Sequence, residues 1–584
     1  MNISEFSKDA VCQYLRSVVL IDDALFNLET VQSLRADTTL DSLPSLGENS
    51  CEILSNGASD SVMQVGDGQP QTNEDLASAN RVDAYAITDA FATKGIICGV
   101  YKPTFFPEKN FKDEPGFGTL LNICKNADVF ILDWNLFAEN AKAVILLLKQ
   151  LLLEDEGTNT PKPLRFCAIY TAENADRICE VVFSAIQEIV SAAKKEETAR
   201  KVCAEGLTVC IYAKEEATSS DAIAATNLAD KIISDYAKTY EGILPALALR
   251  GVASIRNNVK RVLDKFPADM DPALVLHAGL MIQEKCISQN IATLIGDEIA
   301  ALLEDKRVQD ETIYDLCSEY VRQCSDSVFN KTGDGKIDAP ILQNSTSADV
   351  KGFIQRVFSQ HTFFPKNENG VFTPVFKDCK ESNKSGPRWR LVRLLGQFVS
   401  QKASQTGKYK IGAFSALFCH RTNYADLKTL RFGAVVKELT SNGGVERYYL
   451  CLMPLCDSIR LVDQDATGQA KRHKFPFWNL TEVPKDFQGR NHGLVLKGGD
   501  GNYHVYCVKG KIRENFSLFE FNSHGSIVRF DRCGIVRTAD GVQSFEWVAE
   551  LKSAHIQRMA EFVSREFSRI GLTESEWLRL QVNR

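Results

Sequence analysis

The sequence lacks any apolar run of the roughly 18 residues that a membrane-spanning helix needs. Its N-terminus, MNISEFSKDAVCQYLRS, has no basic start followed by an apolar core, so it does not look like a secretory signal peptide. The 17 cysteines follow no regular framework, which is typical of reduced thiols and not of a disulfide scaffold. We therefore expect a cytoplasmic protein without a membrane partner.

Signatures of several enzyme classes are also missing. The sequence has no Gly-rich phosphate loop of the Walker type and no Gly-x-Ser-x-Gly nucleophile motif. The eight histidines are dispersed, and no group of cysteines and histidines has zinc-site spacing. We therefore find no independent enzyme site in residues 238–584. An effector enzyme with dispersed catalytic residues in the β-rich region stays open as an alternative.

Charge is divided unevenly along the chain. Residues 361–584 hold 34 Lys and Arg against 22 Asp and Glu, a net charge of +12, whereas residues 1–360 hold 34 against 53, a net charge of −19. The two parts are expected to bind different partners or to attract each other. Within the acidic part, residues 27–80 contain nine acids and one base. Such a polar stretch cannot bury much apolar surface, and we interpret it as a mobile insertion.

Short apolar strands alternate with helical patterns in the N-terminal part of the sequence. Strands are predicted at 18–21, 96–101, 129–132, 166–170 and 207–212, and helices at 83–93, 117–125, 138–153, 174–196 and from about 220. This alternation predicts an α/β fold, with a doubly wound, five-stranded parallel sheet covered by helices on both faces.

The patterning changes twice in the rest of the chain. Apolar residues first recur at helical spacing, and then β-type runs alternate with Gly and Asn turns. A final helix is predicted at 545–568. We therefore divide the chain into an α/β domain that contains the insertion (1–237), a helical domain (238–369), a β-rich domain (370–540) and a C-terminal helical segment (541–584).

Polar residues stand at or shortly after the ends of four predicted strands. Asp22 and Asp23 follow the first strand, and Asp133 follows the third. Thr171 follows the fourth strand, and Lys214 comes shortly after the fifth. Because the carboxyl ends of parallel strands meet at one edge of the sheet, these side chains should converge. The alternative is an α/β domain whose acids only cap helices, but capping does not account for Lys214.

This set of residue types suits phosphoryl transfer. Three carboxylates at one edge repel one another unless a cation joins them, and Mg²⁺ (magnesium) prefers oxygen ligands. A carboxylate beside Mg²⁺ can accept a phosphoryl group. A nearby hydroxyl and ammonium can bind the transferred oxygens and offset their charge.

The arrangement resembles the receiver domain of bacterial response regulators over residues 1–26 and 81–237. The matching pieces are the acidic pair, Asp-x-Asn at 133–135, Thr-Ala at 171–172 and Lys214. The resemblance implies that Asp133 accepts a phosphoryl group from a histidine kinase. It implies that Mg²⁺ is held by Asp22, Asp23, Asp133 and the main-chain carbonyl of Asn135, and that Thr171 and Lys214 contact the phosphate.

The sequence departs from the family pattern near Lys214. The family usually has Pro after this lysine, where the chain has Glu215, and an aromatic residue three places before it, where the chain has Ile211. Tyr212 stands one place away from that position. These departures affect the family's usual switching route and leave the acceptor residues in place.

A second resemblance concerns the layout of the whole chain. No helix-turn-helix motif is recognisable, and the long helical-then-β tail looks like that of large receiver-containing proteins in bacterial phage-defence operons, including the Detocs-type two-component systems. This resemblance rests on the layout and on RYYLCLMPLCDSIRL at 447–461. It implies a role in antiviral defence.

The expected function is that of a response-regulator-like protein in a phosphorelay, which transmits phosphorylation of Asp133 to a C-terminal region that binds a downstream protein. The alternative is an interaction or nucleic-acid-binding protein with an inactive receiver. Basic stretches with interleaved aromatic residues at 384–410 and 471–478 could grip phosphates and stack bases. We favour the interpretation of these stretches as an amphipathic helix and a solvated loop.

Overall fold

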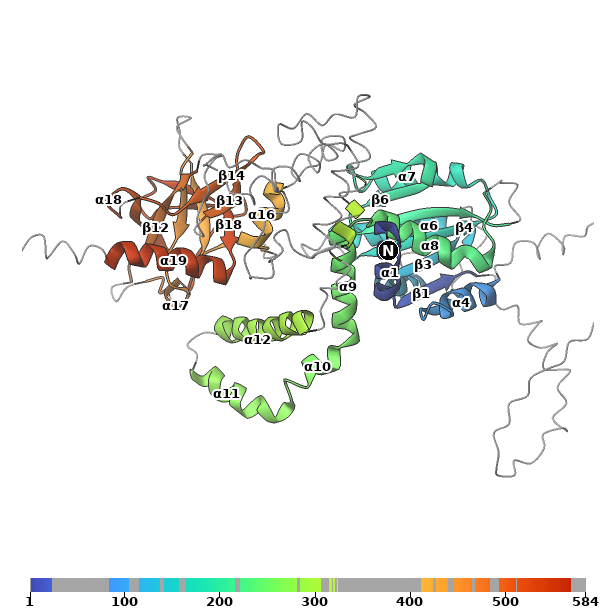
Figure 1. Ribbon diagram of the computed structural model, residues 1–584, viewed down its shortest axis with the longest axis horizontal. Helices are drawn as coiled ribbons and strands as arrows, with labels where there is room; N and C mark the ends of the chain where they lie inside the picture. The colour runs from blue at the N-terminus through green and yellow to red at the C-terminus, as the bar shows by residue number, and fades with distance from the viewer. Residues whose placement is uncertain are drawn as a thin grey trace, which may run out of the picture. The chain divides into compact units, whose positions relative to one another are not determined.

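The computed structural model describes residues 2–23, 83–103, 115–136, 141–156, 164–215, 221–280, 284–305, the short pieces 313, 315–317, 319–320 and 323, and then 411–423, 427–439, 446–458, 461–464, 468–483, 493–510 and 512–568. The predicted insertion at 27–80 and the basic stretch at 384–410 lie outside these residues. The chain divides into two compact units, built mainly of residues 1–264 and 376–584. Figure 1 shows the first in blue to green and the second in orange to red.

A seven-stranded sheet forms the centre of the first unit, in the order β2-β1-β3-β4-β7-β6-β5. Strands β2, β1, β3, β4 and β7 are parallel and have the order typical of a flavodoxin-like doubly wound fold. The predicted α/β fold with five parallel strands is confirmed. The strands are β1 (Ser17–Ile21), β2 (Ile97–Tyr101), β3 (Val129–Asp133), β4 (Arg165–Thr171), β5 (Lys194–Glu196), β6 (Lys201–Ala204) and β7 (Leu207–Ala213).

Helices cover both faces of this sheet. One face packs against α5 (Pro115–Asn126), α6 (Lys142–Glu156) and α7 (Ala175–Gln187). The other face packs against α1 (Ile3–Tyr14), α4 (Ala84–Ala92), α8 (Ala225–Thr239) and α9 (Ile243–Asn257). In β3, Phe130 and Leu132 belong to the first core, whereas Val129 and Ile131 belong to the second, and all four are fully buried. Burial on both faces explains why this strand is apolar without interruption.

The prediction of one helix over 174–196 is wrong at its end. Helix α7 ends at Gln187, and a short 3₁₀ turn (Glu197–Ala199) joins β5 to β6. Strand β5 pairs with β6 and β6 pairs with β7, both in antiparallel fashion, so the sheet is extended by two strands. Val202 of β6 is fully buried in the first core. Tertiary pairing therefore overrides the helix propensity of the Ala- and Lys-rich segment.

Helices continue beyond α9, in agreement with the predicted helical region. They are α10 (Val259–Leu263), a 3₁₀ turn (Ala268–Met270), α11 (Asp271–Leu280) and α12 (Glu284–Asp305). None of the helices in the described part of the chain is both long enough and apolar enough to cross a bilayer. The division into four domains that the sequence suggested stays a prediction.

The second unit is built on a half-barrel sheet of nine strands. The long strand β12 pairs with β11 along one side and with β15 and then β14 along the other. The nine strands are β8 (His420–Arg421), β10 (Ala434–Glu438), β11 (Tyr448–Cys451), β12 (Arg472–Glu482), β13 (Gly493–Lys497), β14 (Tyr503–Cys507), β15 (Phe516–Asn522), β17 (Ile535–Arg537) and β18 (Ser544–Leu551), and a separate pair consists of β9 (Thr429–Leu430) and β16 (Val528–Arg529).

Two apolar cores lie on opposite faces of this second sheet. Along β11, Tyr448 and Leu450 face a core that includes Met559 of α19 (Ser553–Ser568), whereas Tyr449 and Cys451 face a core rich in phenylalanine. This alternation follows the two-residue period of a strand. The shorter helices of the unit are α16 (Ile411–Cys419), α17 (Leu455–Ser458) and α18 (Ile512–Asn515).

The predicted final helix is confirmed only from Ser553. The prediction that it begins at 545 is wrong, because residues 544–551 form β18 and pair with β10 and β17. Phe545, Ala549 and Leu551 are buried in the two cores on either side of the sheet. The apolar residues of this segment are therefore used at strand spacing, and helical spacing begins only after Leu551.

Asp128 connects four elements at the amino end of the first sheet. Its Oδ2 accepts hydrogen bonds from the backbone N–H groups of Arg16 at 2.9 Å and Ser17 at 3.2 Å. Nη2 of Arg256, from α9, lies 3.2 Å from its Oδ1, and the same guanidinium stacks on the ring of Tyr14 in α1. Asp128 is 7% exposed. One buried carboxylate therefore ties α1, β1, β3 and α9 together.

We expect Asp128→Ala to lower the local stability of β1 and β3 by about 2–4 kcal/mol, because two backbone donors and a guanidinium lose their shared acceptor. Native-state hydrogen exchange of peptides from these strands measures the change. Asp89→Ala, which removes an exposed acid from α4, is the control and should change exchange by less than about 0.5 kcal/mol. Equal effects of the two variants would contradict the role of Asp128.

Candidate functional site

The parallel register brings the predicted site residues to one edge of the first sheet. It aligns the residue after β1, Asp22, with Asp133 at the end of β3. Asp23 follows Asp22 directly. Thr171 pairs with the last residue of β7, and Lys214 is the next residue along the chain. The convergence that the sequence predicted is therefore present for the ends of β1, β3, β4 and β7.

The carboxylate of Asp133 lies between two donors. Nζ of Lys214 is 2.7 Å from Oδ1, and the backbone N–H of Asn135 donates to Oδ2 at 3.0 Å. The second contact is an Asx turn, which lets the side chain of the strand's last residue begin the following loop. The side chain of Asp133 is 17% exposed and that of Lys214 is 3% exposed. The acid is therefore held at the surface of the sheet edge beside a buried cation.

Thr171 and Lys214 are joined through their backbones. The N–H of Lys214 donates to the carbonyl oxygen of Thr171 at 2.8 Å, and Oγ1 of Thr171 accepts from the N–H of Glu173 at 3.1 Å. Thr171 is 1% exposed. The hydroxyl and the ammonium predicted to bind phosphate therefore lie on adjacent strands whose ends are tied together.

The sequence analysis missed Glu173. Nδ2 of Asn135 donates to its Oε1 at 2.7 Å, which links the loop after β3 to the loop after β4. Glu173 lies two residues after Thr171, and Asn135 likewise lies two residues after Asp133. This equal distance from a strand end is the sequence feature that could have identified Glu173. Asn135 and Glu173 therefore form a hydrogen-bonded polar pair beside the Asp133 carboxylate.

The oxygen donors at this edge have the chemistry that Mg²⁺ requires. Asp22 is buried, Asp23 is half-buried, and both make polar or electrostatic contacts. Among the residues that the structure describes, however, no three His, Cys, Asp or Glu side chains form a group that could hold a metal ion. In this arrangement the Lys214 ammonium supplies the positive charge beside Asp133. The ligand set of Asp22, Asp23, Asp133 and Asn135 stays a prediction.

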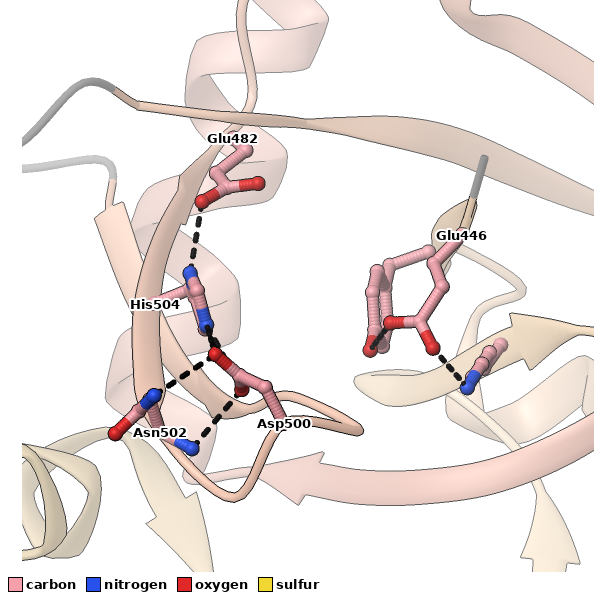
Figure 2. A network of polar contacts seen from close by, with 7 residues as sticks. Glu446, Glu482, Asp500, Asn502 and His504 are labelled. Atoms are coloured by element: carbon pink, nitrogen blue, oxygen red, sulfur yellow. Dashed lines mark hydrogen bonds and ion pairs between the residues drawn. The ribbon is translucent and has the colours of Figure 1, made fainter. Parts of the chain in front are cut away.

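A second cluster of charged side chains lies at the β13–β14 hairpin of the C-terminal unit (Figure 2). Nδ1 of His504 is 2.8 Å from Oε1 of Glu482 in β12, and its Nε2 is 3.1 Å from Oδ1 of Asp500. Asp500 also accepts from the backbone and the side chain of Asn502, both at 2.9 Å. The contacts with Glu482 and Asp500 raise the pKa of His504. The bonds from Asn502 and His504 lower the pKa of Asp500 to about 2.

Glu446 faces the same hairpin from the start of β11 (Figure 2). Its two oxygens are occupied by Nζ of Lys437 at 2.6 Å and the hydroxyl of Tyr448 at 2.9 Å. These two contacts lower the pKa of Glu446. Each acid of this cluster therefore has its own donor within the unit, and we interpret the cluster as a device that holds the hairpin in place.

A serine, a histidine and an acid also meet in the second unit, but not in an order that supports nucleophilic catalysis. Oγ of Ser523 donates to Oδ1 of Asp463 at 2.7 Å. Nε2 of His473 is 3.5 Å from that Oγ and 2.9 Å from the carbonyl oxygen of Val462. A ring nitrogen this close to a carbonyl oxygen carries the proton, so it cannot accept one from the serine.

The interpretation of the second basic stretch as a solvated loop is wrong. Residues 472–482 form β12, and Lys474 lies 3.7 Å from Glu520 of the paired strand β15. Phe475, Phe477 and Trp478 are fully buried in the two cores of the unit. They are therefore not available to stack nucleic-acid bases. The side chains of Phe477 and Trp478 point to opposite faces of the sheet, as successive residues of a strand do.

The pKa of His504 predicts how the stability of the second unit depends on pH. Because this pKa is raised in the folded state, the contribution of His504 is complete below the unfolded value of about 6.5 and is lost as the pH rises through the folded value. We expect wild-type stability to fall from pH 6 towards pH 9, and His504→Gln to show a smaller fall. Thermal unfolding at a series of pH values measures the difference. A His504→Gln profile identical to wild type would contradict the prediction.

Comparison with known proteins identifies the domain family of most of the first unit. Residues 14–219 match the family model of the response receiver domain, and this range contains all six predicted site residues. No curated protein and no solved structure matches the chain, and the resemblance to phage-defence proteins stays a prediction. The matched range agrees with the five parallel strands and with the position of Asp133 at their carboxyl edge. Residues 14–219 of this chain form a response receiver domain.

Proposed function

We propose that the chain is a phospho-accepting signalling protein in which Asp133 receives a phosphoryl group from a histidine kinase. A receiver domain implies response-regulator-like signalling, and the single observation that supports Asp133 as the acceptor is its position. Its carboxylate stands at the carboxyl edge of the receiver sheet, 2.7 Å from the buried ammonium of Lys214. Its other carboxylate oxygen accepts a hydrogen bond from the backbone N–H of Asn135 at 3.0 Å.

In the proposed reaction, a carboxylate oxygen of Asp133 attacks the phosphorus of a phosphohistidine. An O–P bond forms, the N–P bond breaks, and its electron pair stays on the imidazole nitrogen, which takes up a proton. The ammonium of Lys214 and the hydroxyl of Thr171 offset the charge on the transferred oxygens. When bound, Mg²⁺ supplies further neutralisation of those oxygens. The residues that would hold it are Asp22, Asp23, Asp133 and the carbonyl of Asn135.

The C-terminal unit is the proposed output region. It has its own two-faced sheet, and in its described part we find no arrangement that supports catalysis. We therefore propose that it binds a downstream protein when the receiver is phosphorylated. The layout of helices followed by a β-rich unit supports a role in a bacterial anti-phage two-component system.

We expect Asp133→Ala to abolish incorporation of phosphate from acetyl phosphate or from the cognate kinase, because the variant lacks the attacking oxygen. Chelation of Mg²⁺ with EDTA should have the same effect on the wild type. Phosphate-affinity electrophoresis measures the incorporation, and loss of the label at alkaline pH identifies an acyl phosphate. Asp89→Asn, an exposed acid on α4, is the matched control. Mg²⁺-dependent labelling that survives in Asp133→Ala would rule out this acceptor.

Lys214→Met should slow phosphoryl transfer by about 10²–10³-fold, the typical effect of removing one group that stabilises a charged transition state. The methionine keeps the length and the apolar stem of the lysine, so the change is mainly one of charge. Rates of labelling by acetyl phosphate, measured beside circular dichroism spectra that report folding, test this. A folded Lys214→Met chain with a wild-type rate would contradict the role of the ammonium.

A further inference from the structure

The ring of Tyr170 lies against the ammonium of Lys214. Tyr170 is the residue before Thr171 in β4, and Nζ of Lys214 stands 5.7 Å from the centre of its ring, over the face. The tyrosine is 4% exposed and its neighbour Lys214 is equally buried. A cation over an aromatic face in a site that excludes water is held more strongly than at an exposed surface.

The hydroxyl of Tyr170 contacts the chain just before α8. It donates to the carbonyl oxygen of Ile223 at 2.7 Å, and the N–H of Ile223 donates to the carbonyl oxygen of Ala213 at 2.9 Å. Both ends of the segment between β7 and α8 are therefore tied to strands of the sheet. The Tyr170 ring contacts the side chain of Lys214, and the Tyr170 hydroxyl binds the backbone at Ile223.

The other aromatic residue near Lys214 points elsewhere. Tyr212 is paired with Tyr170 in the register of β4 and β7, but its hydroxyl donates to Oδ2 of Asp235 in α8 at 3.2 Å. Ile211 occupies the position where an aromatic residue was expected. The ring over which the Lys214 ammonium stands therefore belongs to β4.

We propose that Tyr170 is a positioning residue that fixes the Lys214 ammonium beside Asp133. A lysine side chain has four flexible bonds, so an ammonium that serves phosphoryl transfer needs contacts that restrict it. The Asp133 oxygen restricts it on one side and the Tyr170 ring on the other. The proposal rests on the proposed function of Asp133 as the acceptor, and it predicts that the ring matters for the reaction while the hydroxyl matters mainly for the loop.

The first test compares phosphoryl-transfer rates from acetyl phosphate in the full-length chain. Tyr170→Leu, which loses the ring, should be slower by about tenfold, and Tyr170→Phe, which keeps the ring, should stay within about twofold of wild type. In a Lys214→Met background the same Tyr170→Leu change should have no further effect, because no ammonium remains to be positioned. A merely structural role for Tyr170 would slow both backgrounds alike.

Tyr212→Leu is the matched control for loss of a buried ring at the paired register position. It should transfer phosphate faster than Tyr170→Leu at a similar loss of thermal stability. Three results would overturn the proposal: wild-type rates in Tyr170→Leu, equal slowing in the Lys214→Met background, or equal slowing by Tyr212→Leu.

A second measurement does not depend on the reaction. In chain labelled with ¹³C at the ε carbon of lysine, the Lys214 signal is identified by its absence in Lys214→Met. Its protons should be shifted upfield by the ring in wild type and in Tyr170→Phe, and should move towards the ordinary lysine position in Tyr170→Leu. An unshifted wild-type signal would overturn the proposal. Shifted protons in a wild type that takes up no phosphate would instead overturn only the proposed function of Asp133.

Discussion

The parallel register of β1, β3, β4 and β7 is the constraint on which the receiver site depends. In the register these strands end within two residues of one another, so residues separated by more than a hundred positions in the chain meet at one edge. A shift of one residue would turn the last side chain of β3 to the opposite face. Full burial of Phe130 and Leu132 on one side, and of Val129 and Ile131 on the other, opposes such a shift.

Two acids at opposite ends of β3 show how position decides the use of a carboxylate. Asp128 precedes the strand and is surrounded by backbone N–H groups and Arg256. Its carboxylate oxygens are therefore already used in hydrogen bonds that join α1, β1, β3 and α9. Asp133 ends the strand, keeps part of its side chain exposed, and meets a single ammonium. The first acid stabilises the fold, and the second is left accessible to a reacting group. The same residue type therefore joins structural elements at one edge, and at the other it stands where we propose that phosphoryl transfer takes place.

The second unit uses its charged residues differently. His504, Asp500 and Glu482 satisfy one another around a hairpin, and the aromatic residues of β12 fill two cores instead of a surface. Polar groups with complete sets of partners rigidify a structure. The described part of this unit therefore has the rigidity that the output role proposed above requires.

The sequence by itself determined the parallel α/β class, the approximate strand positions and the residue types at the strand ends, because burial on both faces leaves uninterrupted apolar runs and the site residues stand directly beyond them. It could not separate α7 from the β5–β6 pair or find the true start of α19, because β5, β6 and β18 obtain their conformation from pairing with other strands, which local propensity does not report. Tyr170 went unrecognised for the same reason, whereas Glu173 had a local signal in its offset from a strand end. Only the tertiary structure brought the ring of Tyr170 to Lys214 and the amide of Asn135 to Glu173, since contacts across neighbouring strands leave no local pattern in the sequence.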